Sequence, residues 1–510
     1  MAKFLRFLLM GLLCLGLAAC SRLPAPVHET MTNTSNTNKV SALAKALAPL
    51  QQANAGQSGV ALLPNGREAL AARLGLIELA QHSIDVQYYI WNDDVAGALM
   101  LDALRRAADR GVLVRLLLDD NNTKGMDDVL WVLNQHKNIH VRLFNPFVHR
   151  RFRLWSYLTD FTRLNRRMHN KSLTVDSTAS IVGGRNIADE YFDIGQETLF
   201  VDLDALVVGP VANAISDDFQ KYWSSQSSYP VDQIVSPSSN RVSIAARASS
   251  AKDQPIGQEY SDFVSKYGLL DAIKNGRLSF SWGPVHLVSD DPRKAQGLAP
   301  QGKLVIDALP HLLGAPQKRF LVVSPYFVPT ETGTQFFSQL AKNGVDVQVV
   351  TNSLAATDVA VVHSGYAKWR KALLQAGLTL FEMKPAYATG QAGRSVFGGS
   401  SASSLHAKTF VVDSSRLFVG SFNFDPRSAR LNTEMGLVIE NPGLVEQVWD
   451  NVQNGLAQSS YEVALKPSGS LVWFDRSNEN SVAYNSEPET NIFSRSAVWL
   501  LSKLPLDWLL

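Results

Sequence analysis

Hydrophobic and polar positions alternate between strand-like and helix-like spacing from about residue 59 onwards. Residues 83–91 (SIDVQYYIW) are rich in β-branched and aromatic side chains, which predicts a strand. Apolar side chains at helical spacing over residues 96–110 predict a helix that ends at Gly111. Residues 112–118 predict a second buried strand. Strands that alternate with helices are typical of an α/β fold.

The same order of elements returns later in the chain, with a strand, a helix and a strand predicted over residues 319–328, 333–343 and 345–351. Tyr89 and Tyr326, in the first strand of each series, lie 237 residues apart. A constant internal offset indicates a duplicated unit. We therefore predict two similar α/β halves, over residues 59–235 and 316–475.

The remaining segments differ in composition from the two predicted halves. We predict a signal peptide, a flexible tether, a linker with a crossing segment, and an apolar C-terminal tail over residues 1–19, 20–58, 236–315 and 476–510. The Gly- and Ser-rich residues 389–404 predict either a mobile flap or a passive surface loop. The tail, with Trp499 and Trp508, could lie at a bilayer interface or dock on the folded body.

The N-terminus has the features of an export signal. Lys3 and Arg6 precede an apolar run over residues 7–19 that is too short to span a bilayer comfortably. The run ends in Ala18-Ala19-Cys20, which resembles the lipobox of bacterial lipoproteins. This resemblance implies cleavage before Cys20 and a lipid anchor on a periplasm-facing protein, in either the inner or the outer membrane. A plain signal peptide is the alternative.

Composition narrows the class of partner. The chain has 510 residues, of which 45% are hydrophobic and 18% charged, which suits two globular lobes. The net charge of +2 lacks the strong basic excess of phosphate-backbone binders, so no nucleic acid is expected as the main partner. The only cysteines are Cys14 and Cys20, so the processed chain would hold no internal disulfide.

One motif occurs twice at the 237-residue offset. Its two copies are His169-x-Lys171-x4-Asp176, followed by Gly183-Gly184-x-Asn186, and His406-x-Lys408-x4-Asp413, followed by Gly420-Ser421-x-Asn423. Each copy predicts a strand, in which a spacing of two places the histidine and the lysine on one face.

These residue types suit chemistry at a phosphodiester. Lysines such as Lys171 and Lys408 neutralise phosphate oxygens as the transition state forms. One histidine can attack phosphorus, and the other can protonate the departing alkoxide. Hydrogen bonds from asparagine and a close approach of backbone at glycine would hold the phosphate, which predicts a phosphate-binding role for Gly184, Asn186, Ser421 and Asn423.

The paired motifs resemble those of the phospholipase D superfamily. This resemblance implies two α-β-α sandwich halves packed about a pseudo-twofold axis, with one shared active site and no metal or cofactor. It also implies a catalytic set of His169, Lys171, Asp176, His406, Lys408 and Asp413. Family members carry an acid that supports the histidine of the other half: Glu434 fits this position in the second half, whereas Asp202 is favoured over Glu197 in the first.

Three other sets of polar residues are candidates for a functional role. Asp119-Asp120 follows a predicted strand, which favours a turn over a metal-binding pair. His363 lies in a helix-like run and is expected to be packed. Three arginines precede the first motif and could attract anionic head groups or form a solvated basic stretch: Arg163, Arg166 and Arg167.

Longer segments, among them DVQYYIWNDD, LNRRMHNKS and GSFNFDPRSARLNTEMG, are similar to bacterial cardiolipin synthases of the C type. This similarity implies transfer of a phosphatidyl group between phospholipids through a phosphohistidine, with phosphatidylglycerol as substrate and phosphatidylethanolamine as an alternative donor. We expect His169 to be the nucleophile and His406 the acid and base. The alternatives are a phospholipase D that hydrolyses phospholipids to phosphatidic acid and a periplasmic nuclease.

Overall fold

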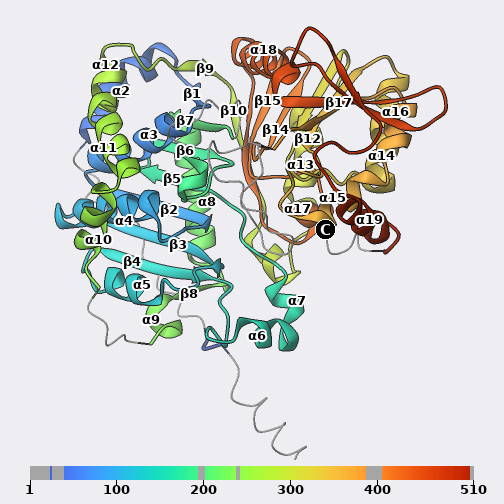
Figure 1. Ribbon diagram of the computed structural model, residues 1–510. Helices are drawn as coiled ribbons and strands as arrows, with labels where there is room; N and C mark the ends of the chain where they lie inside the picture. Colours follow the sequence, from blue (N-terminus) through green and yellow to red (C-terminus); the bar gives the residue numbers. More distant parts are fainter. Residues whose placement is uncertain (1–22, 26–39, 193–201, 237–241, 386–404, 506–510) are drawn as a thin grey trace, which may run out of the picture.

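The computed structural model describes residues 23–25, 40–192, 202–236, 242–385 and 405–505 (Figure 1). Several predictions fall outside these residues: the signal peptide, the lipid-bearing Cys20, the alternative acid Glu197, the Gly- and Ser-rich stretch 389–404, and Trp508.

The first half is built on a nine-stranded sheet in the order β8-β4-β3-β2-β5-β6-β7-β1-β9. Its strands are β1 (Ser58–Leu63), β2 (Ser83–Ile90), β3 (Leu113–Asn122), β4 (Ile139–Phe144), β5 (Ser172–Val175), β6 (Ala179–Gly183), β7 (Asp204–Val208), β8 (Ser228–Pro230) and β9 (Ser281–Gly283). Its helices are α2 (Ala42–Ala53), α3 (Gly66–Leu79), α4 (Val95–Asp109), α5 (Asp127–Asn134), α6 (Arg153–Thr159), α7 (Phe161–Leu164), η1 (Asp189–Tyr191), α8 (Pro210–Trp223), α9 (Val231–Ile234), α10 (Ile244–Lys252), α11 (Pro255–Tyr267) and α12 (Leu269–Lys274).

The second half is built on a ten-stranded sheet in the order β10-β16-β15-β14-β11-β12-β13-β17-β18-β19. Its strands are β10 (Val285–Ser289), β11 (Arg319–Val323), β12 (Asp346–Asn352), β13 (Thr379–Met383), β14 (Thr409–Val412), β15 (Arg416–Gly420), β16 (Met435–Ile439), β17 (Ser460–Leu465), β18 (Leu471–Asp475) and β19 (Val482–Tyr484). Its helices are η2 (Pro292–Gln296), α13 (Val305–Leu313), α14 (Thr330–Lys342), α15 (Ala360–Ala367), α16 (Arg370–Gln375), α17 (Pro426–Arg430), α18 (Pro442–Ser459) and α19 (Ile492–Leu501).

The two sheets repeat one topology. In the first, β2, β3 and β4 are parallel and β5 runs antiparallel to β2; in the second, β11, β12 and β13 are parallel and β14 runs antiparallel to β11. The order β8 to β1 in one sheet matches the order β17 to β10 in the other. The predicted pair of similar α/β halves is therefore confirmed.

The halves meet through a shared apolar cluster that brings the two motif-bearing regions together (Figure 1). Strands β6 and β7 and helix α8 contribute Val182, Val207 and Ile215, and the second half contributes side chains of β15, β16 and α18, among them Val419, Leu437 and Val448. Helices α3 and α4 pack in a separate core on the first half. Each sheet thus has helices on both faces, and one helix from each half lies at the interface.

Three segments outside the two predicted halves contain helices or strands. The tether 20–58 contains helix α2, whose Leu43 and Leu47 are fully buried, because its apolar side chains recur at helical spacing. The segment 236–315 is not a linker alone. Its helices α10 to α12 pack on α3 and α4, β9 extends the first sheet, and β10 joins the second.

The C-terminal tail is also partly folded. Helix α19 packs against α15 and buries Val498, while Phe493 and Trp499 remain exposed on its outer side. Among the described residues, no helix combines the length and the apolar character that a transmembrane span requires.

Candidate active site

Both motif histidines lie just before a strand, at the interface between the halves. The strands begin at Ser172 and Thr409, so the predicted strand character covers only the later part of each motif. The extended backbone before β5 crosses to the other half: the amide of His169 donates to the carbonyl oxygen of Thr433 at 2.8 Å. The reacting ends of both motifs therefore depend on the packing of the two halves.

His169 of the first half is paired with Glu434 of the second. Its Nδ1 lies 2.9 Å from Glu434 Oε2, and both side chains are buried. Glu434 also accepts hydrogen bonds from the hydroxyls of Ser421 and Ser428. Burial raises the pKa of Glu434 to about 7. Burial, followed by the positive charges of Lys171 and Lys408, holds the pKa of His169 well below 6.5.

His406 of the second half is paired with Asp202 of the first. Its Nδ1 lies 2.6 Å from Asp202 Oδ2. Burial alone would raise the pKa of Asp202, but the charges of His406, Lys408 and Arg185 outweigh burial and lower this pKa to about 2. Burial and the charge of Lys408 lower the pKa of His406 to about 4 against the opposing effect of Asp202. The structure thus places each predicted supporting acid beside the histidine of the other half.

The two motif lysines lie close enough to influence one another. Lys171 Nζ donates to the carbonyl oxygen of His169 at 2.6 Å and lies 5.6 Å from the ring centroid of Tyr89. Lys408 Nζ contacts the carbonyl oxygen and both ring nitrogens of His406. Burial, and then the charge of Lys408, lowers the pKa of Lys171; burial lowers that of Lys408 to about 8. Two desolvated cations beside two histidines form a site for an anion.

Two of the four predicted phosphate-binding positions lie against the acids of these pairs. Gly184 lies directly against Asp202, since a Cβ atom there would lie 2.1 Å from Asp202 Oδ1. Ser421, at the equivalent position, donates to Glu434. Asn186 is fully buried and its Oδ1 accepts from the amide of Ile90, and Asn423 is buried as well.

Asp176 and Asp413, which the resemblance placed in the catalytic set, do not contact the histidine pairs. Asp176 accepts from the amides of Gln81, His82 and Ser83, at the start of β2. Asp413 accepts from the amides of Gln317, Lys318 and Arg319, at the start of β11. The full length of β5 or β14 separates each aspartate from its histidine. Each aspartate thus accepts hydrogen bonds at the start of the adjacent antiparallel strand, β2 or β11.

Asp119 and Asp120 correct another prediction. They belong to strand β3, which continues to Asn122, and are fully buried instead of forming an exposed turn. Asp119 Oδ2 lies 3.3 Å from Arg167 Nε, and Asp120 pairs with Arg150. Buried carboxylates require such partners. Arg167 is therefore a buried structural cation, neither a solvated residue nor one exposed at a pocket mouth.

The other two arginines and His363 are also held by protein groups. Arg163 binds Asp160 at 2.6 Å, and an Arg166 nitrogen donates to the carbonyl oxygen of Arg430 in the second half at 3.1 Å. His363 is buried beside Arg370, as expected for a packed histidine.

Several residues that contact the site were not predicted as site residues. The ring of Tyr89 meets His169 edge-on at 5.0 Å, and that of Tyr191 meets His406 at 4.9 Å. Asp290, in the predicted linker, accepts from the amide of Glu434 at 2.8 Å and from Lys294 at 2.7 Å. The constant offset marked Tyr89 as part of the repeat, but no sequence signal linked Asp290 to the site.

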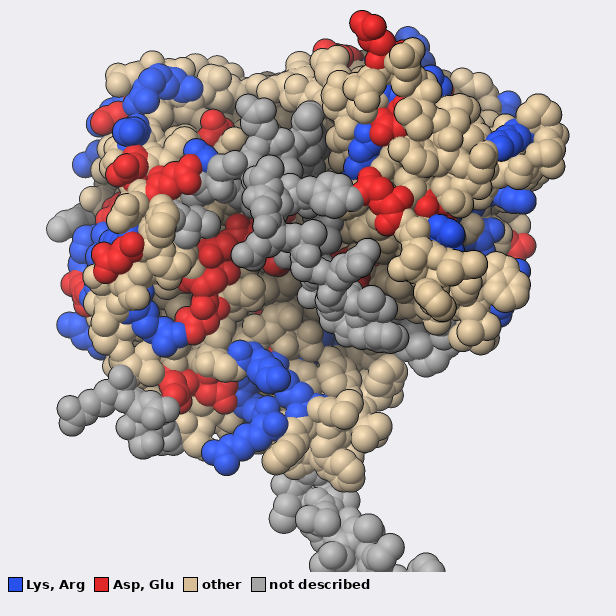
Figure 2. Space-filling view, in the orientation of Figure 1, with Lys and Arg blue, Asp and Glu red and all other residues tan. Residues whose placement is uncertain are grey.

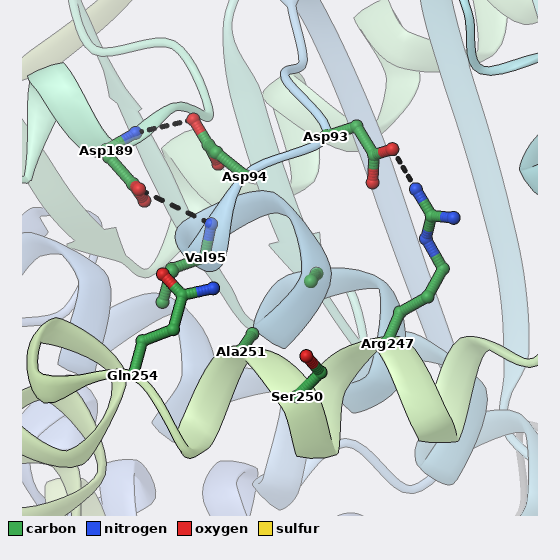
Figure 3. Close-up of a pocket in the computed structure, with 9 residues that line it drawn as sticks. Asp93, Asp94, Val95, Asp189, Arg247, Ser250, Ala251 and Gln254 are labelled. Atoms are coloured by element: carbon green, nitrogen blue, oxygen red, sulfur yellow. Dashed lines mark hydrogen bonds and ion pairs between the residues drawn. The ribbon is translucent and has the colours of Figure 1, made fainter.

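A separate cavity of about 300 Å³ lies between α10 and the start of α4 (Figure 3). Its carboxylates already have partners: Asp189 accepts from the amide of Ala96 at 2.7 Å, and Asp94 accepts from the amide of Asp189 at 2.9 Å. Asp93 pairs with Arg247 across it. No motif residue lines this cavity, and its acids hold the start of a helix.

The geometry and the sequence place the chain in one family. Residues 74–223 and 309–455 match the family described as "Cardiolipin synthase, PLD-like domain". The chain belongs to this family, which confirms the resemblance stated from the motifs.

Particular relatives extend the match over nearly the whole chain. It is 44% identical over 471 residues to cardiolipin synthase C of Escherichia coli (strain K12), covering 92% of this chain and 99% of the relative. It is 33% identical over 447 residues to an uncharacterized protein of Helicobacter pylori, covering 87% of this chain and 88% of the relative. The fold is similar to that of phosphatidylserine synthase of Haemophilus influenzae Rd KW20, with a TM-score of 0.57 at 15% identity over 91% of this chain and all of the other.

Proposed function

We propose that this chain makes cardiolipin by transferring a phosphatidyl group from one phospholipid to another. The observation that carries the proposal is the reciprocal pairing of two motif histidines with acids of the opposite half, beside two buried lysines. The similarity to cardiolipin synthase C over nearly its full length supports the choice of substrate and acceptor. We assign phosphatidylglycerol to both roles, with phosphatidylethanolamine as an alternative donor.

The site can perform the transfer in two displacements. Nε2 of His169 attacks phosphorus, so that an N–P bond forms while the P–O bond to the head group breaks. His406 gives its proton to the departing alkoxide. His406 then takes the proton of the acceptor hydroxyl, whose oxygen attacks phosphorus and releases His169. The two lysines offset the charge that grows on the phosphate oxygens.

The difference between the two acid–histidine pairs supports these roles. A nucleophilic histidine must be neutral, and His169 has the more strongly buried ring, with 9% of its side chain exposed against 20% for His406. An acid and base must hold a proton for part of the cycle. Ionised Asp202 stabilises that proton on His406, and a bound phosphodiester would further raise the pKa of this ring by offsetting the lysine charges.

We further propose that the protein acts at the periplasmic side of a membrane, to which a lipid on Cys20 attaches it. The lipobox-like residues that precede Cys20 support this placement. Metabolic labelling with a fatty-acid analogue should mark the wild-type protein and not the Cys20→Ala variant. Equal labelling of both would contradict the anchor.

The catalytic proposal is tested with purified protein and vesicles of labelled phosphatidylglycerol. The expected products are cardiolipin and free glycerol, and the His406→Ala variant should form no cardiolipin. Phosphatidic acid as the sole lipid product would show that water is the acceptor and that the protein is a hydrolase. Addition of labelled phosphatidylethanolamine identifies the donor, because only a donor loses its head group.

A further inference from the structure

Helix α6 carries the largest exposed apolar side chains near the first motif. Five of them lie on or beside α6 and α7, with exposed fractions of 73%, 76%, 56%, 73% and 42%: Phe152, Leu154, Trp155, Leu158 and Phe161. Soluble surfaces seldom gather so many large apolar side chains in one place. Figure 1 shows α6 and α7 projecting from the body of the first half.

The inner side of α6 is firmly attached to the protein. Ser156 is buried and its hydroxyl accepts from the amide of His149 at 3.0 Å. The hydroxyl of Tyr157 donates to Asn121 Oδ1 at 2.7 Å, and its ring packs edge-on against Phe147 at 5.4 Å. The apolar side chains therefore point outward from a positioned helix, which makes their exposure a property of the fold.

The segment that carries this apolar surface has an excess of basic residues. Residues 149–167 (HRRFRLWSYLTDFTRLNRR) contain six arginines and a single acidic residue, Asp160. Arg151 is exposed, and Figure 2 shows a group of Lys and Arg side chains beside the surface of α6. An apolar face edged with cations is typical of helices that lie in the interface of an anionic bilayer.

The same segment leads directly into the active site. Helix α7 ends five residues before His169. Asn121, which holds Tyr157, is followed by Asn122, whose side chain donates to the carbonyl oxygen of Tyr89 at 3.2 Å. Tyr89 in turn contacts the ring of His169. Helix α6 is thus linked to His169 through the contacts of Tyr157, Asn122 and Tyr89.

We propose that α6 and α7 form the membrane-docking surface of the protein, which inserts Leu154, Trp155 and Leu158 among the head groups of a bilayer that contains anionic phospholipid. The choice of bilayer rests on the proposed function, which takes its substrate from a membrane. A docked protein would hold His169 and His406 near the lipid phosphodiesters. A substrate lipid would then not have to leave the bilayer completely in order to react.

An environment-sensitive fluorophore tests the contact directly. It is attached to Leu158→Cys in the full-length Cys14→Ser chain, reconstituted in vesicles of phosphatidylglycerol and phosphatidylethanolamine that carry a spin-labelled lipid. We expect a blue-shifted emission that the spin label quenches. The matched control is Val482→Cys on β19, which also replaces an exposed apolar side chain and should report water. Emission from the Leu158 probe that stays typical of water in the presence of vesicles would overturn the proposal. So would emission that shifts with protein concentration before vesicles are added, because a second copy of the protein would then cover the surface.

Turnover gives a second, independent measurement. Leu154→Ser combined with Leu158→Ser should lower turnover on vesicles at least about tenfold, because two apolar anchors are lost, and should leave turnover on monomeric short-chain phosphatidylglycerol unchanged. Ile492→Ser combined with Trp499→Ser makes the matched change on α19. Loss of vesicle turnover in the α19 variant alone would assign docking to the C-terminal helix and refute this proposal. If the wild type were inactive on both substrates, the proposed function would fail, and the fluorophore would still decide the docking surface.

Discussion

The two acid–histidine pairs of the site differ in the groups that surround the acid. Burial outweighs the charge of Lys171 and the hydroxyls of Ser421 and Ser428 around Glu434, and it raises the pKa of this acid to about 7. Around Asp202 lie the cations Lys408 and Arg185, and the pKa of this acid is held at about 2. One acid titrates near neutral pH, whereas the other is ionised under all ordinary conditions.

This difference arises although the motifs themselves are repeated. The position that corresponds to Glu434 by the 237-residue offset is Glu197, yet the acid that contacts His406 is Asp202, five residues further along the chain. Gly184 leaves room for the shorter acid, and Ser421 supplies a hydroxyl to the longer one. Duplication therefore preserved the geometry of the pairs while their electrostatics diverged, which allows two similar histidines to take different roles.

Removal of the histidines should have the largest effect. His169→Ala and His406→Ala should each lower turnover on the order of 10⁴-fold or more, because the two rings act as a unit. Rapid-quench labelling sharpens the comparison: His406→Ala should retain a slowly formed phosphoprotein and His169→Ala should form none. The exposed His286→Ala is the matched control and should behave as wild type. If the His169→Ala variant formed a phosphoprotein, His406 would be the nucleophile and His169 the acid and base.

Removal of the acids should lower turnover with a different pH dependence in the two pairs. Asp202→Asn should lower turnover on the order of 10³-fold, as for other acids that orient a catalytic histidine, by a factor that is constant between about pH 5 and pH 9, since Asp202 is ionised throughout. For Glu434→Gln the loss should depend on pH. Ionised Glu434 accepts the Nδ1–H of His169, so its advantage is present above a pH of about 7 and disappears as the carboxylate is protonated below it. Parallel pH profiles for the two variants would contradict the assigned difference.

Much of this architecture could be predicted from local patterns. Strand and helix spacing located β2, α4 and β12, and the constant offset predicted two halves. The family resemblance predicted the paired acids, of which Asp202 departs from that offset. The sequence pattern could not show the contacts between buried charged residues that lie far apart in the sequence. Asp119 and Asp120 resemble turn residues because their partners, Arg167 and Arg150, lie 30 or more residues away in the sequence. Asp290 was assigned to a linker for the same reason, since its contact with Glu434 exists only after the halves have packed.

Gly184 and Ser421 occupy equivalent positions, so matched changes there should have unequal effects. Gly184→Ala would bring a Cβ atom to 2.1 Å from Asp202 Oδ1, and displacement of this acid should lower turnover on the order of 100-fold. Ser421→Ala only removes a hydrogen bond to Glu434 and should keep turnover at high pH within about tenfold of wild type. Because that bond lowers the pKa of Glu434, its loss should move the acid limb of the profile to higher pH. Equal losses in both variants would show that the two acids are not held differently.

The smallest effect on turnover should come from replacing the last residue of each motif, Asp176 or Asp413. Asp176→Asn and Asp413→Asn retain a residue that tolerates the observed left-handed backbone, with φ of 51° at both positions, but lose the charge that accepts three amides. Each should lower the free energy of unfolding by about 1–2 kcal/mol, measured by urea denaturation, while turnover of the folded protein stays within about threefold of wild type. Asp346→Asn, at an exposed aspartate, is the control. A loss of turnover comparable to that of His169→Ala, without a loss of stability, would return these aspartates to the catalytic set.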